Sequence, residues 1–123
     1  MDSRYSNSII VCAFNEEENI FHCLSSIEKA VEKIINYEVL VINNGSSDNT
    51  NVKIKDFFNN SSKIFANNLK VFNINHVGLS EARNFGVKKC NGNFISFVDA
   101  DATVDINWLN EINLSFKKYD IDI

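Results

Sequence analysis

The chain of 123 residues has 45% hydrophobic and 23% charged residues, which is typical of one globular domain and argues against a disordered or coiled-coil protein. Its formal net charge of −4 argues against a nucleic-acid partner, because nucleic-acid-binding domains usually carry a basic surface. An acidic domain can still hold an anionic ligand through a metal ion.

Short apolar runs alternate with amphipathic runs along the chain. Residues 8–14 are a continuous apolar run, typical of a strand buried on both faces. Apolar side chains then recur every three or four residues from Ile20 to Ile35, which predicts a helix, and Asn15 is predicted to cap it. The other elements are predicted as strands at 38–42, 69–74, 93–98 and 119–123, and as helices at 51–58, 81–89 and 105–118.

This alternation predicts an α/β fold, a Rossmann-like open and mainly parallel sheet with helices on both faces. In such sheets ligands bind beyond the carboxyl ends of the strands. Polar clusters follow three of the predicted strands, at Asn15, at residues 43–48, and at Asp99 and Asp101. The sequence therefore predicts one ligand site at this edge of the sheet.

The acidic pair Asp99-Ala100-Asp101 directly follows an apolar strand. Two carboxylates on a tight turn, with one residue between them, can both face a divalent cation, and oxygen ligands suit Mg²⁺ and Mn²⁺. Such a metal would neutralise a diphosphate leaving group. The alternative interpretation is that the two acids cap the following helix or are simply solvated.

Two further segments carry candidate ligand groups. The stretch 43–48 is either an ordinary turn or a place where an Asn amide reads the edge of a base, since an amide both donates and accepts. The stretch 78–84 opens a helix, and helix N-termini attract phosphate. Arg83 within it either pairs with a diphosphate, orients the acidic pair, or forms an ordinary surface ion pair with a local acid.

The cysteines and histidines do not form a metal-binding pattern. Cys12, Cys23 and Cys90 lie at wide spacing without a C-x-x-C pair, so reduced thiols in a cytoplasmic protein are the expectation. His22 is expected at the surface, and His76, at the end of the third strand, is expected to pack. No apolar run approaches the length of a membrane span.

Four stretches together resemble a known family. They are residues 9–16, ending in Phe-Asn-Glu; residues 41–50, with Asn-Asn-Gly-Ser; residues 78–86, with Ala-Arg-Asn; and residues 92–101, with the D-x-D pair. Their order and spacing resemble the N-terminal, nucleotide-sugar-binding half of an inverting family 2 glycosyltransferase with the GT-A fold. The sequence departs from the family pattern at Cys12 and Ala13, where Pro-Thr is frequent, at Asn43 and Asn44, which replace the commoner acidic pair, and at Ala102, where a third acid often follows.

The resemblance implies a site and a cofactor. Phe14 takes the place of the aromatic residue beside the nucleobase, and Asn44 that of the residue that hydrogen-bonds the base. Asp101 is expected to coordinate Mn²⁺ or Mg²⁺, and Asp99 to contact the sugar or ribose and share in the metal site. The implied donor-binding residues are Ala13, Phe14, Asn15, Glu16, Asn43, Asn44, Ser46, Arg83, Asp99 and Ala100, and the implied metal ligands are Asp99 and Asp101.

The resemblance also implies a donor, an acceptor and the part of the enzyme that this chain represents. The donor is expected to be a nucleotide-diphosphate sugar, a UDP-sugar first of all, and the acceptor a glycan or glycolipid. In this family the general base lies in the acceptor half, beyond the D-x-D pair, so no catalytic residue is assigned in this chain and the base is expected beyond Ile123. Residues 1–123 are therefore expected to be one donor-binding domain, the truncated N-terminal part of a longer enzyme, inactive alone.

Further expectations concern location and assembly. The longer protein is expected in the cytoplasm, peripherally at the inner face of the membrane, and the exposed sheet edge is expected to support a homodimer. Two other functions remain open: a non-catalytic nucleotide-binding module, and a phosphotransferase that uses Asp99 as nucleophile.

Overall fold

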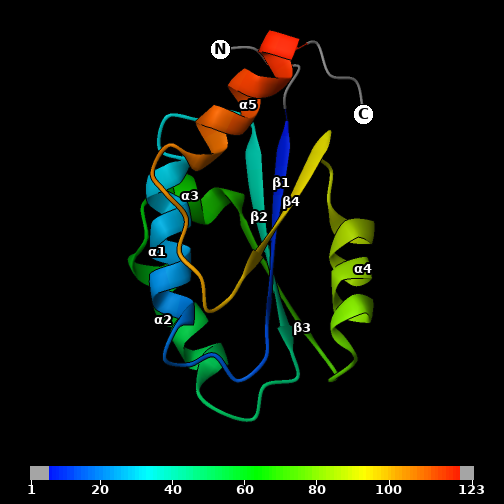
Figure 1. Ribbon diagram of the computed structural model, residues 1–123. Coiled ribbons are helices and arrows are strands. Elements are labelled where there is room, and N and C mark those ends of the chain that lie inside the picture. The colour runs from blue at the N-terminus through cyan, green and yellow to red at the C-terminus, as the bar shows by residue number, and fades with distance from the viewer. Residues whose placement is uncertain (1–5, 120–123) are drawn as a thin grey trace.

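The strands form one parallel sheet. The computed structural model of the protein describes residues 6–119, with side chains up to residue 115. Within these residues the sheet has four strands in the order β3-β2-β1-β4, and each neighbouring pair is parallel. The strands are β1 (Asn7–Ala13), β2 (Tyr37–Asn44), β3 (Leu69–Ile74) and β4 (Phe94–Asp99), and Figure 1 shows them side by side.

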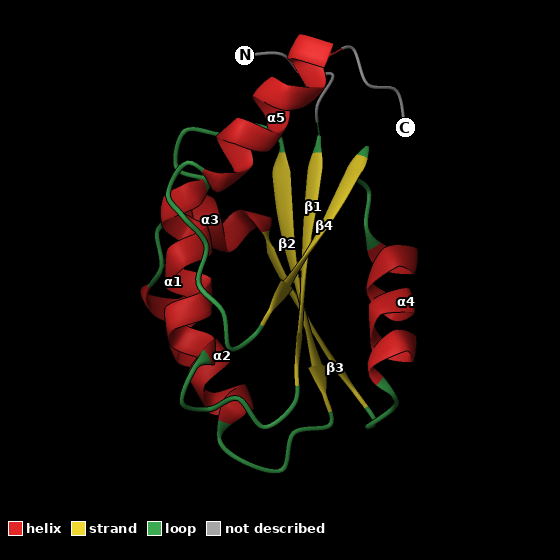
Figure 2. Cartoon of the chain, viewed as in Figure 1, coloured by secondary structure: helices red, strands yellow, loops and turns green. Residues whose placement is uncertain are grey.

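Helices cover both faces of this sheet, as predicted. Figure 2 shows two helical layers, one on either side of the strands. The first layer is α1 (Ile20–Ala30), α2 (Thr50–Asn60), α3 (Lys63–Asn68) and α5 (Trp108–Tyr119), and α4 (Leu79–Lys89) lies on the opposite face. The α/β class with a parallel sheet is therefore confirmed.

The alternation of side chains along the central strands builds two cores. Ile9 and Val11 of β1 point toward the face covered by α1, whereas Ile10 points toward α4. In β2, Val39 and Val41 join the first core, and Leu40 joins the second. Because both faces of β1 and β2 are buried, these strands need apolar residues at nearly every position, which is the pattern of a doubly covered parallel sheet.

The strand register brings the carboxyl ends level with one another. Cys12 of β1 pairs with Asp99 of β4, and Asn43 of β2 pairs with both Ala13 of β1 and Asn73 of β3. All four strands run in the same direction, so the loops that follow them leave from the same end of the sheet, at the bottom of the view in Figure 1.

The predicted cap of the first helix is wrong. Asn15 has a left-handed backbone, with φ of 52°, and α1 begins five residues later at Ile20 with Asn19 as its N-cap. Between them the chain turns, and the amides of Asn19 and Ile20 both donate to the Glu16 carbonyl. Asn15 does not cap the helix because its side chain bonds to the loop after β2.

Other element predictions also differ from the structure, including the last helix, which begins at Trp108 rather than at residue 105. The first helix ends at Ala30 rather than Ile35, and Asn43 and Asn44 belong to strand β2 rather than to the following loop. Helix α3 was not predicted, because its six residues are too few for a clear period; Ser62 begins it by accepting a hydrogen bond from the Phe65 amide.

The last predicted strand, 119–123, lies partly outside the described residues. Its first residue belongs to helix α5, and the rest, up to Ile123, is not described. The strand prediction is therefore wrong at residue 119 and stays a prediction for residues 120–123. The general base that was expected beyond Ile123 also lies outside the described part of the chain.

Within the described residues, no helix is both long and apolar enough to cross a bilayer.

Candidate functional site

The polar clusters that the sequence predicted at three strand ends lie together at one edge of the sheet. The loop after β1 contacts the loop after β2 through several hydrogen bonds, and the D-x-D turn follows β4 beside the end of β1. The loop after β3 also reaches this edge, because the amide and carbonyl of Val77 both bond to Asn44. Four loops from distant parts of the sequence therefore lie at one edge of the sheet, where the sequence predicts a site.

An aromatic pair marks one side of this edge. The Phe14 ring lies 4.2 Å from the His76 ring, centroid to centroid, and 45% of Phe14 is exposed. His76 is held in place by its Nδ1, which lies 3.0 Å from the Asn44 carbonyl oxygen. Two partly exposed rings at the carboxyl edge offer a flat face to a planar ligand.

His76 was expected to pack, and it does pack against Phe14, but its side chain is exposed at the site. Sequence reasoning therefore missed it as a site residue. Its place at the end of the third strand was the signal that could have found it.

The amides of Asn43 and Asn44 are buried rather than presented to a ligand. The Asn44 side chain donates to the Val77 carbonyl and accepts from the Val77 amide, both at 2.9 Å. Asn43 donates to Asn73 Oδ1 at 2.9 Å, and its own Oδ1 is buried without a hydrogen-bond partner among the described residues. Only 5% of Asn43 and 4% of Asn44 is exposed, so in this structure the Asn43 side chain joins β2 to β3 and the Asn44 side chain fixes the loop after β3.

Asn15 and Ser46 join the loops after β1 and β2. The backbone amide of Asn15 donates to Ser46 Oγ at 3.0 Å, and the Asn15 side-chain oxygen accepts from the amide of Ser47 at 2.8 Å. The amide of Glu16 donates to Thr50 Oγ1 at 2.9 Å. Because these amides already have partners inside the protein, they are not free donors for a phosphate.

The two alanines among the predicted donor-binding residues have buried side chains. Ala13, at the end of β1, and Ala100, in the D-x-D turn, both belong to the core that β1 shares with α1. A ligand at this edge would therefore meet their main-chain atoms rather than their methyl groups.

The D-x-D turn presents two exposed carboxylates. The Ala102 amide donates to the Asp99 carbonyl at 2.9 Å and closes the turn, and Asp99 and Asp101 are both exposed. Arg83, from the second turn of α4, has its Nη2 3.5 Å from Asp99 Oδ1, and its guanidinium lies 5.5 Å from the centre of the Phe97 ring. This contact fits two of the roles that the sequence left open for Arg83, orienting the acidic pair and forming a surface ion pair with a local acid.

A buried thiol lies behind the turn. Cys23 of α1 donates its S–H to the Asp99 carbonyl at 3.6 Å. Burial raises the pKa of the Cys23 thiol to about 12, and the negative charge of nearby carboxylates adds to this effect; in order of size these belong to Asp101, Glu16 and Asp99. The acids of the β1–α1 loop and of the D-x-D turn therefore contribute to one region of negative potential.

The donor set of this turn fits a divalent cation. The two exposed carboxylates of Asp99 and Asp101 supply oxygen ligands, which Mg²⁺ and Mn²⁺ prefer. Within residues 6–119, no three His, Cys, Asp or Glu side chains gather closely enough to hold a metal ion by themselves. Magnesium sites of this kind commonly use one or two carboxylates and complete their shell with water and phosphate oxygens.

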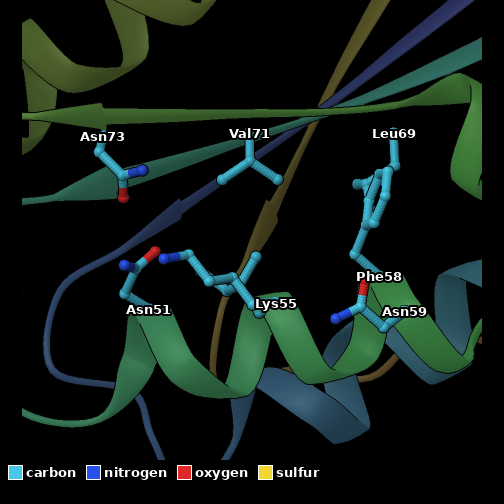
Figure 3. A pocket seen from close by; sticks show the side chains of 8 residues that line it. Asn51, Lys55, Phe58, Asn59, Leu69, Val71 and Asn73 are labelled. Atoms are coloured by element: carbon cyan, nitrogen blue, oxygen red, sulfur yellow. The ribbon is translucent and has the colours of Figure 1, made fainter.

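An apolar groove lies beside this edge rather than at it. It has a volume of about 370 Å³ and runs between α2 and the edge strand β3. Figure 3 shows Asn51 and Asn73 at one end of the groove, with Lys55 reaching toward Asn51, and Phe58 and Leu69 at the other end. We place the candidate site at the carboxyl edge and not in this groove, because the predicted site residues gather there.

The fold and this edge define an α/β domain of the open parallel-sheet class, with an acidic pair at the end of its fourth strand. The sequence matches Glycosyl transferase family 2 over residues 8–123, and the chain belongs to this family.

Curated relatives agree with this assignment. The chain is 30% identical to glycosyltransferase GlyA of Streptococcus pneumoniae over 94% of its own length and 16% of that protein. It is 35% identical to the UDP-Glc:alpha-D-GlcNAc-diphosphoundecaprenol beta-1,3-glucosyltransferase WfgD of Escherichia coli, over 79% of the chain and 35% of that protein. The chain thus spans about a third or less of the length of these relatives.

Solved structures show the same fold. TarS of Staphylococcus aureus in complex with UDP superposes with a TM-score of 0.76 at 27% identity, over 92% of this chain and 32% of that one. TarS in complex with UDP-GlcNAc gives a TM-score of 0.75 at 28% identity, over 92% of this chain and 31% of that one. The expected GT-A-like architecture is therefore confirmed.

Proposed function

We propose that this chain is the donor-binding domain of an inverting glycosyltransferase and that it binds a nucleotide-diphosphate sugar. The observation that carries the proposal is the meeting of the Phe14–His76 pair and the D-x-D turn at one sheet edge in a family 2 chain. An aromatic face suits a nucleobase, and paired acids with a nearby Arg suit a diphosphate held through a metal.

A UDP-sugar is the donor we propose. Support comes from TarS, which shares this fold at 27–28% identity and is solved with UDP and with UDP-GlcNAc, and from WfgD, whose name gives UDP-Glc as its donor. In this proposal the Phe14 ring and the main chain of Ala13 line the base side. Asn43 joins β2 to β3, and Asn44 fixes the loop after β3. Asn44 would read the base only by exchanging its bonds to Val77.

Asp99 and Asp101 are the residues that we propose to hold Mn²⁺ or Mg²⁺. Such an ion, when bound, would neutralise the diphosphate that leaves during transfer. Arg83 lies beside Asp99 and supplies a second positive charge on the same side. The main-chain amides of Asn15 and Glu16 bind Ser46 and Thr50, so the diphosphate would rely on Arg83 and the ion instead.

Transfer itself, the acceptor and the location belong to the same proposal. The match covers only 16% of GlyA and 35% of WfgD, and we propose that residues 1–123 bind the donor but transfer sugar poorly alone. The general base is proposed to lie beyond Ile123, in the acceptor half. A glycan or glycolipid acceptor, and a cytoplasmic protein at the inner face of the membrane, are proposed for the longer enzyme. A non-catalytic nucleotide-binding module remains the alternative.

Thermal unfolding against a panel of nucleoside diphosphates, with and without Mn²⁺, tests donor binding. A ligand present at about 100 times its dissociation constant stabilises a protein by about 2.7 kcal/mol, which shifts the melting temperature visibly. We expect UDP with Mn²⁺ to give the largest shift. Asp101→Ala should remove the Mn²⁺-dependent part, because it deletes one of the two proposed ligands.

Asp56→Ala is the matched control, since Asp56 is an exposed acid on α2, away from the strand ends. This variant should keep the full Mn²⁺-dependent shift. The proposed site would be contradicted if every nucleotide gave the same shift in melting temperature and Asp101→Ala left that shift unchanged. No shift with any nucleotide would contradict donor binding by this chain.

A further inference from the structure

Three consecutive amides of the loop after β1 all donate to side chains of the segment after β2. Asn15 N lies 3.0 Å from Ser46 Oγ, and Glu16 N lies 2.9 Å from Thr50 Oγ1. Glu17 N lies 3.3 Å from Asp48 Oδ2. This region of the β1–α1 loop is therefore held by side chains that are distant in the sequence.

The contact is reciprocal. The Asn15 side-chain oxygen accepts from the amides of Ser47, at 2.8 Å, and Asp48, at 3.3 Å. To place its side chain there, Asn15 adopts the left-handed backbone with φ of 52°, which asparagine tolerates better than most residues. We call these bonds between residues 15–17 and residues 46–50 the loop clamp.

Asp48 and Thr50 form the centre of the loop clamp. Asp48 Oδ1 accepts from both the amide and the hydroxyl of Thr50, which turns a lone pair of that hydroxyl toward Glu16 N. The other carboxylate oxygen, Oδ2, accepts from Glu17 N. Thr50 is fully buried, so water cannot replace its hydroxyl if that group is removed.

Capping of α2 explains only half of this arrangement. An acid near the start of a helix commonly accepts from an amide of the first turn, and the bond from Thr50 N to Asp48 Oδ1 is of that kind. The bonds from Glu16 to Thr50 and from Glu17 to Asp48 cross to another loop, and α2 does not need them. Phe14 directly precedes the clamped residues, and its ring lies against His76 at the candidate site.

We propose that Asp48 and Thr50 are positioning residues, which hold residues 15–17 so that Phe14 is already oriented toward the nucleobase of the donor. The inference rests on the proposed function, because only a nucleotide ligand would use the orientation of Phe14. Ordering this loop before binding spares the ligand the entropy of ordering it, which raises affinity.

The test compares two substitutions at one buried position. Thr50→Val keeps the size of the side chain and removes the acceptor for Glu16 N, whereas Thr50→Ser keeps the hydroxyl. UDP affinity, measured calorimetrically with Mn²⁺ at a temperature where every variant is folded, should fall about tenfold in Thr50→Val, because the Glu16 amide loses its partner and the loop is no longer ordered before UDP binds. Thr50→Ser should restore most of this affinity, to within about twofold of the parent chain.

Hydrogen exchange gives a readout that does not depend on UDP. The amide of Glu16 should exchange faster in Thr50→Val and remain protected in Thr50→Ser. Asp48→Asn keeps Oδ1 for Thr50 but replaces the oxygen that accepts from Glu17, so it should release the Glu17 amide selectively. Ser62→Ala is the matched control: it removes a hydroxyl that accepts from the Phe65 amide far from the site, and it should leave UDP affinity unchanged.

The outcomes separate the two proposals. The positioning role would be overturned if Thr50→Val and Thr50→Ser bound UDP with equal affinity. It would also be overturned if both variants and Ser62→Ala lost UDP affinity to the same degree. If the parent chain binds no nucleoside diphosphate, the proposed function fails and the orientation of a donor fails with it. In that case unchanged exchange at Glu16 in Thr50→Val would also overturn the loop clamp, and faster exchange would support it as a structural device.

Discussion

Gly45, in the loop after β2, lies against the backbone of His76, one member of the aromatic pair. Its φ is +68°, and a Cβ built on it would lie 2.6 Å from the amide nitrogen of His76. A side chain at this position would meet both backbone strain and a backbone clash, and the clashing atom cannot move without displacing the β3–α4 loop. The approach of these two loops therefore depends on a residue without a side chain.

Gly45→Ala is predicted to destabilise the domain by about 1–3 kcal/mol, since it forces a left-handed residue against backbone. Urea unfolding measures the change. Gly78→Ala is the matched comparison, because its φ is ordinary and its Cβ would come no closer than 3.8 Å to Glu81 Oε1. Gly78→Ala should leave the free energy of unfolding nearly unchanged. If both variants lost the same free energy of unfolding, the close approach of the two loops at Gly45 would not be the cause of the loss.

At the scale of the elements, one buried carboxylate ties several strands together at the end of the sheet opposite to the site. Glu38 of β2 accepts from Ser8 Oγ of β1 at 2.6 Å and from Lys70 Nζ of β3 at 2.7 Å. The amide of Asn91, in the turn before β4, also donates to it. Burial alone would raise the pKa of Glu38, but the bonds from Lys70, Ser8 and Asn91 outweigh it and lower the pKa below its usual value.

The lowered pKa of Glu38 predicts an acid-sensitive contribution to stability. Because the folded-state pKa lies below the unfolded one, the contribution is present above the ordinary glutamate value and is lost as pH falls through the folded pKa. Glu38→Gln should reduce the free energy of unfolding by about 1–3 kcal/mol at neutral pH, the range for a hydrogen-bonded buried charge. In acid, the free energies of unfolding of Glu38→Gln and of the parent chain should become more similar, because Glu38 is then protonated in the parent chain as well.

Urea titrations at neutral pH and in acid, below the ordinary pKa of glutamate, check this prediction. Glu32→Gln serves as the control, since Glu32 is exposed in the turn after α1. A Glu38→Gln deficit that persists unchanged at low pH would contradict the assignment, because it would reflect packing rather than ionisation.

At the scale of the whole molecule, α4 leaves part of its face of the sheet uncovered. The helix packs on β1 and β2, and the outer strand β4 exposes 39% of Ile95 and 46% of Phe97. β4 is also an edge strand among the described residues, so its outer backbone groups have no neighbouring strand there. Exposed apolar edges favour pairing with another strand, which supports the proposed homodimer.

The proposed homodimer gives a prediction for solution. The chain should behave as a dimer in light scattering behind size exclusion, and Ile95→Lys should shift it toward the monomer, because an edge lysine opposes strand pairing. Val52→Lys is the matched control, since Val52 is a comparably exposed apolar residue on α2. A monomeric parent chain, or a dimer that survives Ile95→Lys, would contradict pairing through β4.

The sequence by itself determined the alternation of strands and helices, the burial of β1 and β2 and the site edge. Apolar runs with few polar interruptions require burial on both faces, and crossovers between parallel strands bring their carboxyl ends to one side. The acidic pair at Asp99 and Asp101 was recognisable because it directly follows such a run. These features depend on local pattern, which a single sequence carries.

Only the tertiary structure decided what the polar side chains at that edge do. Asn15 was predicted to cap a helix, yet its side chain bonds to the loop after β2; Asn44 was predicted to read a base, yet its amide holds Val77. His76 was predicted to pack, and only the structure shows that it packs on Phe14, a residue distant in the sequence. Each of these polar groups has several possible partners in the chain. The parallel sheet decides among them, because it brings only certain loops within hydrogen-bond distance of one another.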